Sequence, residues 1–187
     1  MNPPSRKQLR LKTYDYRLPG AYFITVCTHK RQRLFCPERN GTQAVPYADG
    51  ENSPSVGHDL CVVPPSNAII HKWIKETEHK FKISIDKHII MPDHIHLLIL
   101  IEERHGSPFL PEIMRWFKTM TTNEYIRAVK VGALPLFHQK LWQKSYYDHI
   151  VRNDEDYEQT WQYIENNPLQ RLIDIENAQK KKRNPHL

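Results

Sequence analysis

Cysteine is scarce in this sequence, and the few cysteines present are not spaced for a shared structural role. Cys27, Cys36 and Cys61 are odd in number, and no two of them form a C-x-x-C pair. A disulfide framework or a structural zinc site is therefore not expected. A reducing compartment such as the cytoplasm fits this cysteine content best.

Long apolar segments and internal repeats are also lacking. The longest apolar run, "HLLILI", is far shorter than the roughly 20 residues that a membrane-spanning helix needs. The first residues, "MNPPSRKQLRLK", are polar and do not have the apolar centre of a signal peptide. The sequence therefore predicts a soluble, cytoplasmic protein.

The length and charge allow one compact domain with a polyanionic partner. The chain has 187 residues, and its 27 Lys and Arg against 21 Asp and Glu give a net charge of +6. Nucleic acid is a suitable partner for this charge, although many basic proteins bind none. We expect a basic N-terminal arm over 1–20, a single domain over 21–170 with a polar insertion at about 37–66, and a basic tail over 171–187.

The hydrophobic periodicity predicts an α+β fold. Strands are expected over 21–28, 82–91 and 94–100, and helices over 67–81, 108–130 and 153–168. In the second strand, Ile83, Ile85, Ile89 and Met91 are expected to share one face. The order of elements fits a ferredoxin-like or RRM-like sandwich, an antiparallel sheet with helices on one face.

Two histidines stand at the start of the third strand. Side chains alternate along a strand, so His94 and His96 share one face. Two imidazoles at this spacing can converge on one cation, and the preceding Asp93 would support them or bind the cation itself. A single His-x-His pair is also compatible with two histidines that only pack in a core or at a sheet edge.

The last predicted helix carries a tyrosine beside its apolar stripe. Tyr157, Trp161 and Ile164 follow the i, i+4, i+7 spacing of a buried face. Tyr163 lies on the polar flank of this stripe, and Asn167, four residues on, lies beside it. A tyrosine at a helix edge is commonly a packing residue, so its position alone assigns no function.

The two patterns together suggest a metal site with a phenol beside it. In this interpretation His94, His96 and Asn167 hold the metal, and Tyr163 is the phenol. A phenol is a poor nucleophile in water because it is mostly protonated at neutral pH. A divalent cation that polarises a phosphate eases such an attack. On a basic protein, this combination suggests phosphoryl transfer on nucleic acid.

Four stretches in this order resemble the single-tyrosine transposases of the HUH superfamily, specifically the REP-associated group. They are "AYFITVCTHKRQRLF", "HIIMPDHIHLLI", "LWQKSYYDHIVRNDEDY" and "YIENNPLQ". In these transposases the HUH motif is two histidines that flank a bulky hydrophobic residue. With the intervening helices, the four stretches span most of residues 20–170.

The resemblance implies a ferredoxin-like fold and a specific chemistry. His94 and His96 would bind Mg²⁺ or Mn²⁺, Tyr163 would be the nucleophile, and Asn167 would be the third ligand. Asp93 stands where the family commonly has Asn or Glu. Members of the family cut single-stranded DNA near hairpins formed by palindromic repeats, leaving a 5′-phosphotyrosine and a free 3′-OH. Within the superfamily the tyrosine helix serves either its own subunit or a partner's. The resemblance therefore implies a monomer or a homodimer.

Tyr146 and Tyr147 are rival nucleophiles by residue type. They lie in the segment 133–149, which is expected to be irregular, and neither has a metal-ligand type of residue four positions on. The resemblance also places aromatic residues at these positions without a catalytic role. We therefore expect Tyr163 to be the nucleophile.

Several basic and aromatic residues are candidates for contacts with DNA. Lys118, Arg127, Lys144 and Arg152 would contact phosphates, and Trp142 would stack on unpaired bases. The basic arm or tail would recognise the hairpin. Each cation could equally be an ordinary solvated side chain, and Trp142 could equally belong to the core.

Two other functions compete with nuclease activity. A nucleotide hydrolase of the histidine-triad type would need a third histidine where Leu98 stands, so that function is not expected. A non-catalytic or domesticated nucleic-acid-binding module of the same fold stays open as the alternative.

Overall fold

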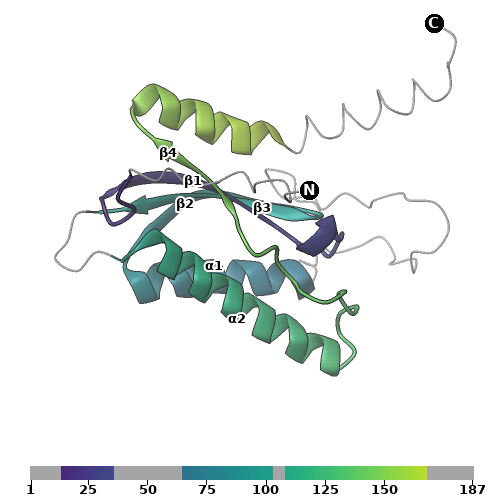
Figure 1. The fold of residues 1–187 in the computed structure, drawn as a ribbon. Helices are drawn as coiled ribbons and strands as arrows, with labels where there is room; N and C mark the ends of the chain where they lie inside the picture. The colour runs from purple at the N-terminus through teal and green to yellow at the C-terminus, as the bar shows by residue number, and fades with distance from the viewer. Residues whose placement is uncertain (1–13, 36–64, 103–107, 168–187) are drawn as a thin grey trace, which may run out of the picture.

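The computed structural model describes residues 14–35, 65–102 and 108–167 (Figure 1). The elements are β1 (Gly20–Cys27), the 3-10 helix η1 (His29–Arg31), α1 (Pro65–Phe81), β2 (Ser84–Met91), β3 (His94–Ile101), α2 (Leu110–Lys130) and β4 (Tyr147–Val151). A further helix over residues 154–167 follows β4 and is called helix 154–167 below. None of the helices described is long and apolar enough to cross a membrane.

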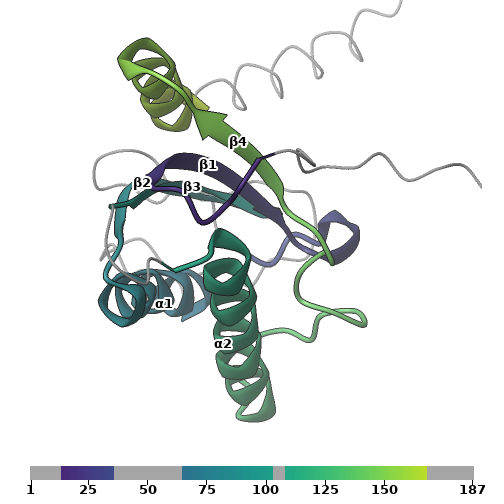
Figure 2. The same ribbon diagram turned by 60° about the vertical axis from the view of Figure 1, so that its left-hand side comes forward.

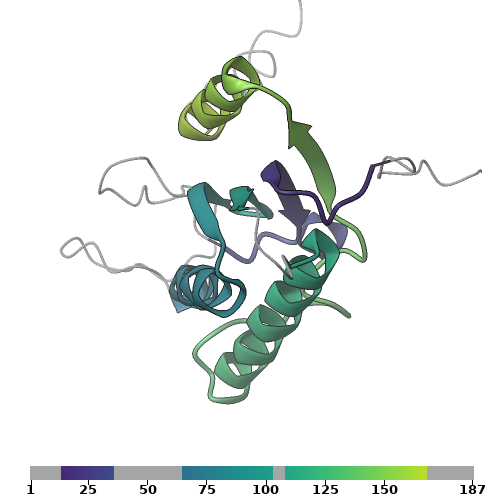
Figure 3. The same ribbon diagram turned by 90° about the vertical axis from the view of Figure 1, so that its left-hand side faces the viewer.

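The four strands form one antiparallel sheet in the order β2-β3-β1-β4. With α1 after β1 and α2 after β3, this is the ferredoxin-like βαββαβ arrangement. The predicted fold class is therefore confirmed. As expected, α1 and α2 lie together on one face of the sheet (Figures 1 and 3). Helix 154–167, yellow-green in Figure 1, covers the opposite face, which differs from the expectation that the helices lie on one face.

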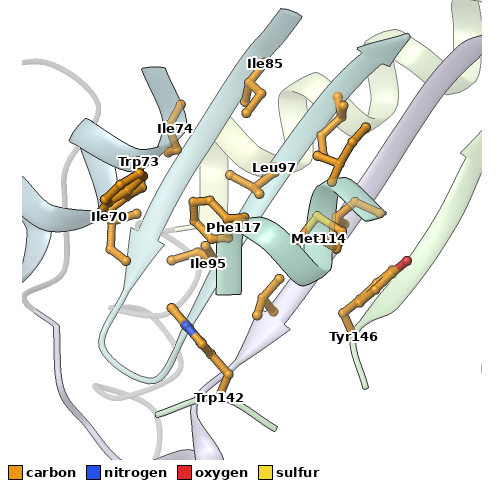
Figure 4. Close-up of a cluster of buried hydrophobic side chains, with 14 of the residues drawn as sticks. Ile70, Trp73, Ile74, Ile85, Ile95, Leu97, Met114, Phe117, Trp142 and Tyr146 are labelled. Carbon is orange, nitrogen blue, oxygen red and sulfur yellow. The ribbon is translucent and has the colours of Figure 1, made fainter. Parts of the chain in front are cut away.

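The main core fills the space between the sheet and the helices α1 and α2. Figure 4 shows Ile95 and Leu97 of β3 facing Phe117 and Met114 of α2, and all four are almost fully buried. Trp73, in the middle of α1, belongs to the same cluster. This packing anchors one face of β3 to the core. The side chains on the opposite face of the strand therefore have a defined position.

The strand β4 was not anticipated from the sequence. Residues 147–151 pair with β1, and Figure 2 shows β4 running beside β1 before the chain enters helix 154–167. Tyr147, Asp148 and His149 give this segment little apolar alternation, which is why it was expected to be irregular. As an edge strand it is held by backbone pairing to β1 on one side only.

A β-bulge in β2 contradicts the prediction that four of its apolar residues share one face. The register of β2 against β3 shifts between Ile85 and Lys87. Ile85 packs in the main core, whereas Ile89 and Met91 pack in a second cluster under helix 154–167. One extra residue inverts the alternation of the residues that follow it.

The predicted division into arm, domain, insertion and tail stays a prediction. Residues 1–13, 36–64 and 168–187, which include most of the expected arm, insertion and tail, lie outside the described residues. Tyr16, at the end of the expected arm, is buried and its hydroxyl donates to Asp148 Oδ2 at 2.6 Å. Helix α1 begins at Pro65, two residues before the predicted start.

Candidate functional site

The two histidines lie side by side on the face of β3 that helix 154–167 covers. The β1–β3 register places His96 opposite Thr25 and His94 opposite Cys27. The two imidazole centroids are 4.8 Å apart and the rings are nearly perpendicular. The structure thus brings the His-x-His pair together on one face, as the alternation predicts.

Each imidazole is held by an oxygen atom at its Nδ1 atom. Asp93 Oδ1 lies 2.7 Å from Nδ1 of His94, and Thr25 Oγ1 lies 2.8 Å from Nδ1 of His96. Oxygen partners of this kind fix the orientation of metal-binding histidines and leave Nε2 for the metal. The other carboxylate oxygen of Asp93, Oδ2, lies 3.5 Å from Arg31 Nη1. Asp93 is thus placed to orient the His94 ring.

His96 is kept neutral by its surroundings. His96 is only 3% exposed. Burial lowers the pKa of His96 to about 3, and the nearby His94 and Arg31 add to this effect. A neutral imidazole is the form that binds a metal, so the ring is ready to bind across the physiological pH range.

Helix 154–167 begins with the predicted cap and buries the predicted stripe. Asn153 Oδ1 accepts a hydrogen bond from the backbone N–H of Asp156 at 2.8 Å. Ile164 is fully buried in the second cluster, where Tyr157 and Trp161 pack beside it. Its other members come from the sheet and are Phe23, Ile89, Met91 and Leu98.

Polar contacts to β2 add to this docking. The Tyr157 hydroxyl donates to Asp86, and Lys87 pairs with Glu165. Lys87 Nζ also lies 4.0 Å from the ring centroid of Trp161. The consecutive residues Asp86 and Lys87 both reach the helix, and they stand where the bulge interrupts the alternation of β2.

Tyr163 and Asn167 meet the histidines from this helix. The Tyr163 ring packs edge-on against His96 and Phe23, with centroid distances of 5.5 Å and 5.7 Å. Asn167 Nδ2 lies 3.4 Å from His96 Nε2. Tyr163 is 53% exposed, so a large part of this side chain faces solvent. The structure therefore gathers all four predicted residues of the site.

The donor set fits a divalent cation. Within the described ranges no three His, Cys, Asp or Glu side chains form a cluster that could hold a metal, and the further residue beside the imidazoles is an asparagine, Asn167. The side-chain amide of Asn167 stands at Nε2 of His96, and half a turn of that amide exchanges its nitrogen for its oxygen. Imidazole nitrogens favour a first-row transition metal over Mg²⁺, and an amide oxygen suits Mn²⁺.

Tyr163 has a contact that the rival tyrosines lack. Tyr146 is 6% exposed and belongs to the main core. Tyr147 is 51% exposed, but it begins β4, so the expectation that it lies in an irregular segment is wrong. Burial and the hydrogen bond to Asp86 raise the pKa of Tyr157 to about 12. Among these tyrosines, Tyr163 is the one whose ring packs on His96.

Trp142 does not have the position expected of a base-stacking residue. It is 4% exposed, its ring stacks on Phe35, and its Nε1 donates to Thr121 Oγ1 at 2.9 Å. The indole is thus part of the core, because the residue is buried and its N–H is hydrogen-bonded inside the protein. The predicted contact between Trp142 and DNA is wrong for this reason.

The predicted phosphate-binding cations are spread over different surfaces. Lys118 and Arg127 belong to α2, on the face of the sheet opposite to the histidines, and Lys118 Nζ donates to the backbone oxygens of Gln143 and Lys144. Lys144 is exposed near this helix. Arg152 is exposed between β4 and helix 154–167, which places it closer to Tyr163 in the fold.

Three residues of the site were not found from the sequence. Thr25 orients His96, Phe23 supports the rings of His96 and Tyr163, and Arg31 approaches Asp93. Strand alternation alone would have placed Phe23 and Thr25 on one face of β1, but only the pairing of β1 with β3 shows which histidine they contact. Arg31 is the last residue of η1 and has a φ of 56°, which no pattern in the sequence indicates.

Comparison with known proteins agrees with this geometry. A family model described as transposase, IS200-like, matches residues 63–167. The chain belongs to the IS200-like transposase family. This family was expected from the motif stretches, and its match includes the histidine pair, Tyr163 and Asn167.

Individual relatives of this IS200-like transposase extend the comparison beyond the matched range. An uncharacterized protein of Haemophilus influenzae is 30% identical over an alignment of 176 residues, and the match covers 88% of each chain. The solved structure of a REP-associated tyrosine transposase bound to a REP hairpin is similar in fold, with a TM-score of 0.55 and 16% identity. The similarity covers 87% of this chain and 73% of the other.

Proposed function

We propose that this IS200-like transposase is a metal-dependent single-stranded DNA endonuclease and strand transferase that acts at hairpin-forming palindromic repeats. The observation that carries the proposal is the packing of Tyr163 against His96, with Asn167 at Nε2 of the same imidazole. The family supports DNA transposition, and a relative of similar fold is bound to a REP hairpin.

The residues around Tyr163 would hold a cation beside the reacting phosphate. His94, His96 and Asn167 would bind Mg²⁺ or Mn²⁺, which would neutralise charge on the phosphate and make its phosphorus a better electrophile. Asp93 and Thr25 hold the two imidazoles in place. The neutral state of His96 removes competition from a proton at the same nitrogen.

Tyr163 would supply the nucleophilic oxygen. Its hydroxyl oxygen forms a bond to phosphorus while the bond from phosphorus to the 3′ oxygen of the preceding nucleotide breaks. The phenolic proton leaves to solvent, and the departing 3′ oxygen takes up a proton to become a free 3′-OH. The 5′-phosphotyrosine keeps the energy of the broken bond, so a 3′-OH can attack it and rejoin the strand without ATP.

The docking of helix 154–167 supports action in cis by a monomer. Ile164 packs on the sheet of its own chain, and Tyr157 and Lys87 join the helix to β2 of the same chain. These contacts hold Tyr163 beside the histidines that precede it in the chain. A homodimer that exchanges this helix between subunits would have to break them.

End-labelled oligonucleotides test this function. Single-stranded hairpins from the repeats that flank the gene would be incubated with Mn²⁺ or Mg²⁺ and run on a denaturing gel. A 3′ label should move to a protein–DNA band, and a 5′ label should appear in a shorter free product. Tyr163→Phe and His96→Ala should abolish both products, whereas Gln162→Ala, an exposed residue of the same helix, should keep them.

The same gel separates the competing function from nuclease activity. A wild-type protein that binds the hairpin but yields neither product with either metal would be a non-catalytic nucleic-acid-binding module. Products with the two labels exchanged would show that the tyrosine retains the opposite end of the strand, and would contradict the proposed polarity.

A further inference from the structure

A groove of about 360 Å³ opens beside Tyr163, between helix 154–167 and the edge of the sheet. Its other lining residues are Phe23, Tyr147, His149, Asp156, Gln159 and Thr160. The volume is near the lower end of the ~300–1,000 Å³ that ligand pockets span. The groove is therefore sized for a single small group and not for a segment of duplex.

Two aromatic side chains that line this groove are strongly exposed to solvent. Tyr147 is 51% exposed and Tyr163 is 53% exposed, and both are among the few large, exposed apolar side chains in the described ranges. Phe23 also lines the groove, and its ring contacts the Tyr163 ring edge-on. Exposed rings arranged in this way are typical of surfaces on which unpaired bases stack.

The polar groups of the groove suit an uncharged ligand. His149 Nε2 lies 2.9 Å and 3.0 Å from the two carboxylate oxygens of Asp156, and the backbone N–H of Arg152 donates to the same carboxylate. Among the described residues, no lysine or arginine side chain lines the groove. A phosphate would meet the Asp156 carboxylate, and His149, the one basic side chain of the lining, is already paired with that carboxylate, so the groove does not suit the DNA backbone.

A nucleobase meets both requirements, because it has two apolar faces and a polar edge without charge. The His149–Asp156 pair and the amide of Gln159 provide donors and acceptors for such an edge. We propose that this groove binds one unpaired base of the nucleotide next to the scissile phosphate, stacked on Tyr147. The inference rests on the proposed function, since Tyr163 defines which phosphate is cut.

Base binding in the groove would position the strand for attack by Tyr163. A base held between Tyr147 and helix 154–167 would fix its own sugar and phosphate close to the Tyr163 hydroxyl. The groove would then select strands in which this nucleotide is unpaired, since a paired base cannot leave its duplex without cost. It would also make the rate of cleavage depend on the base at that position.

A double-mutant cycle between protein and DNA tests the groove. Single-turnover cleavage would be measured on hairpin oligonucleotides with an abasic site at each position flanking the cut, with wild type, Tyr147→Ala, Tyr147→Phe and Gln159→Ala. One abasic position should slow the wild type roughly 5- to 150-fold. Tyr147→Ala should slow the intact substrate similarly, and should add little on that abasic substrate.

Two variants keep the test independent of folding. Tyr147→Phe retains the ring and should cleave close to the wild-type rate, and Gln162→Ala, on the same helix but outside the groove, should match the wild type. The groove would not be a base-binding site if the reductions in cleavage rate caused by Tyr147→Ala and by the abasic site multiplied when the two were combined. The same conclusion would follow from a Tyr147→Ala variant that cleaves as fast as the wild type.

A binding measurement separates failure of this inference from failure of the proposed function. A fluorescent 2-aminopurine at the critical position should be quenched by stacking in the catalytically inactive Tyr163→Phe protein, and Tyr147→Ala should restore its fluorescence. Quenching without any cleavage by the wild type would refute the nuclease but keep the groove. Cleavage without quenching at any flanking position would refute the groove alone.

Discussion

Thr25 Oγ1 lies 2.8 Å from Nδ1 of His96, and the β1–β3 register sets the two residues directly opposite each other. This contact is a property of the sheet and not of a loop, so the orientation of the imidazole is as rigid as the strand pairing. Asp93 does the same for His94 from the β2–β3 turn. The two histidines are thus oriented by contacts within the protein alone.

Thr25→Val should weaken metal binding while it preserves the fold. Valine keeps the β-branched shape but removes the oxygen that holds His96, and loss of such a partner typically costs about 10- to 100-fold in metal affinity. Calorimetric titration with Mn²⁺ measures this change. Thr119→Val, on α2 and away from the site, is the matched control. Equal affinity of Thr25→Val and wild type would show that Thr25 does not orient a ligand.

Ile164→Ala should loosen helix 154–167 from the sheet. Removing a fully buried side chain of this size costs about 2–5 kcal/mol, and here the cost falls on the docking of one helix. Hydrogen exchange should speed up in residues 154–167 but not in α2, and the yield of covalent adduct should fall. Glu158→Ala, exposed on the same helix, should change neither. Unaltered exchange in Ile164→Ala would contradict the docked position of the helix.

Acid should destabilise the metal-free protein through His96. Its pKa is about 3 in the folded protein against a usual value of 6.5, so between these values the unfolded chain binds the extra proton. The free energy of unfolding should therefore fall by roughly 2 kcal/mol from this residue between pH 7 and pH 5. Denaturant unfolding in the presence of a chelator measures it. His96→Gln should lose this part of the slope, and parallel profiles of the two proteins would refute the burial of a neutral His96.

Complementation should fail if the site is assembled in cis. Tyr163→Phe and His96→Ala each lack one half of the site, and the helix contacts place both halves in one chain. A mixture of the two variants should therefore form no adduct above that of either alone. Recovery of activity in the mixture would show that the helix serves a partner subunit.

Much of the site could be predicted because each part rests on a short-range pattern. Strand alternation places His94 and His96 on one face, and helical spacing places Tyr163 and Asn167 together on the flank of the stripe that contains Ile164. The step that sequence patterns cannot supply is which face of the sheet the helix covers. That face is set by contacts such as Ile164 with the sheet and Lys87 with Glu165, which join residues far apart in the chain.

The features that were missed share a physical cause. The bulge at Ile85–Lys87 depends on pairing with β3, and β4 is a strand only because β1 offers it an open edge. Trp142 lies in a polar, aromatic segment whose composition is typical of a surface. Its indole N–H nevertheless donates to Thr121 inside the core. In each case a tertiary partner overrides what the local sequence favours.

The most direct measurement is identification of the residue that carries the DNA. Wild-type protein would be trapped with a hairpin oligonucleotide and Mn²⁺, digested with nuclease and protease, and its peptides sequenced by mass spectrometry. A nucleotide attached to Tyr163 is the predicted result, because this ring lies against His96 beside the proposed metal ligands. Attachment to Tyr147, or to any other residue, would contradict the assignment of the site.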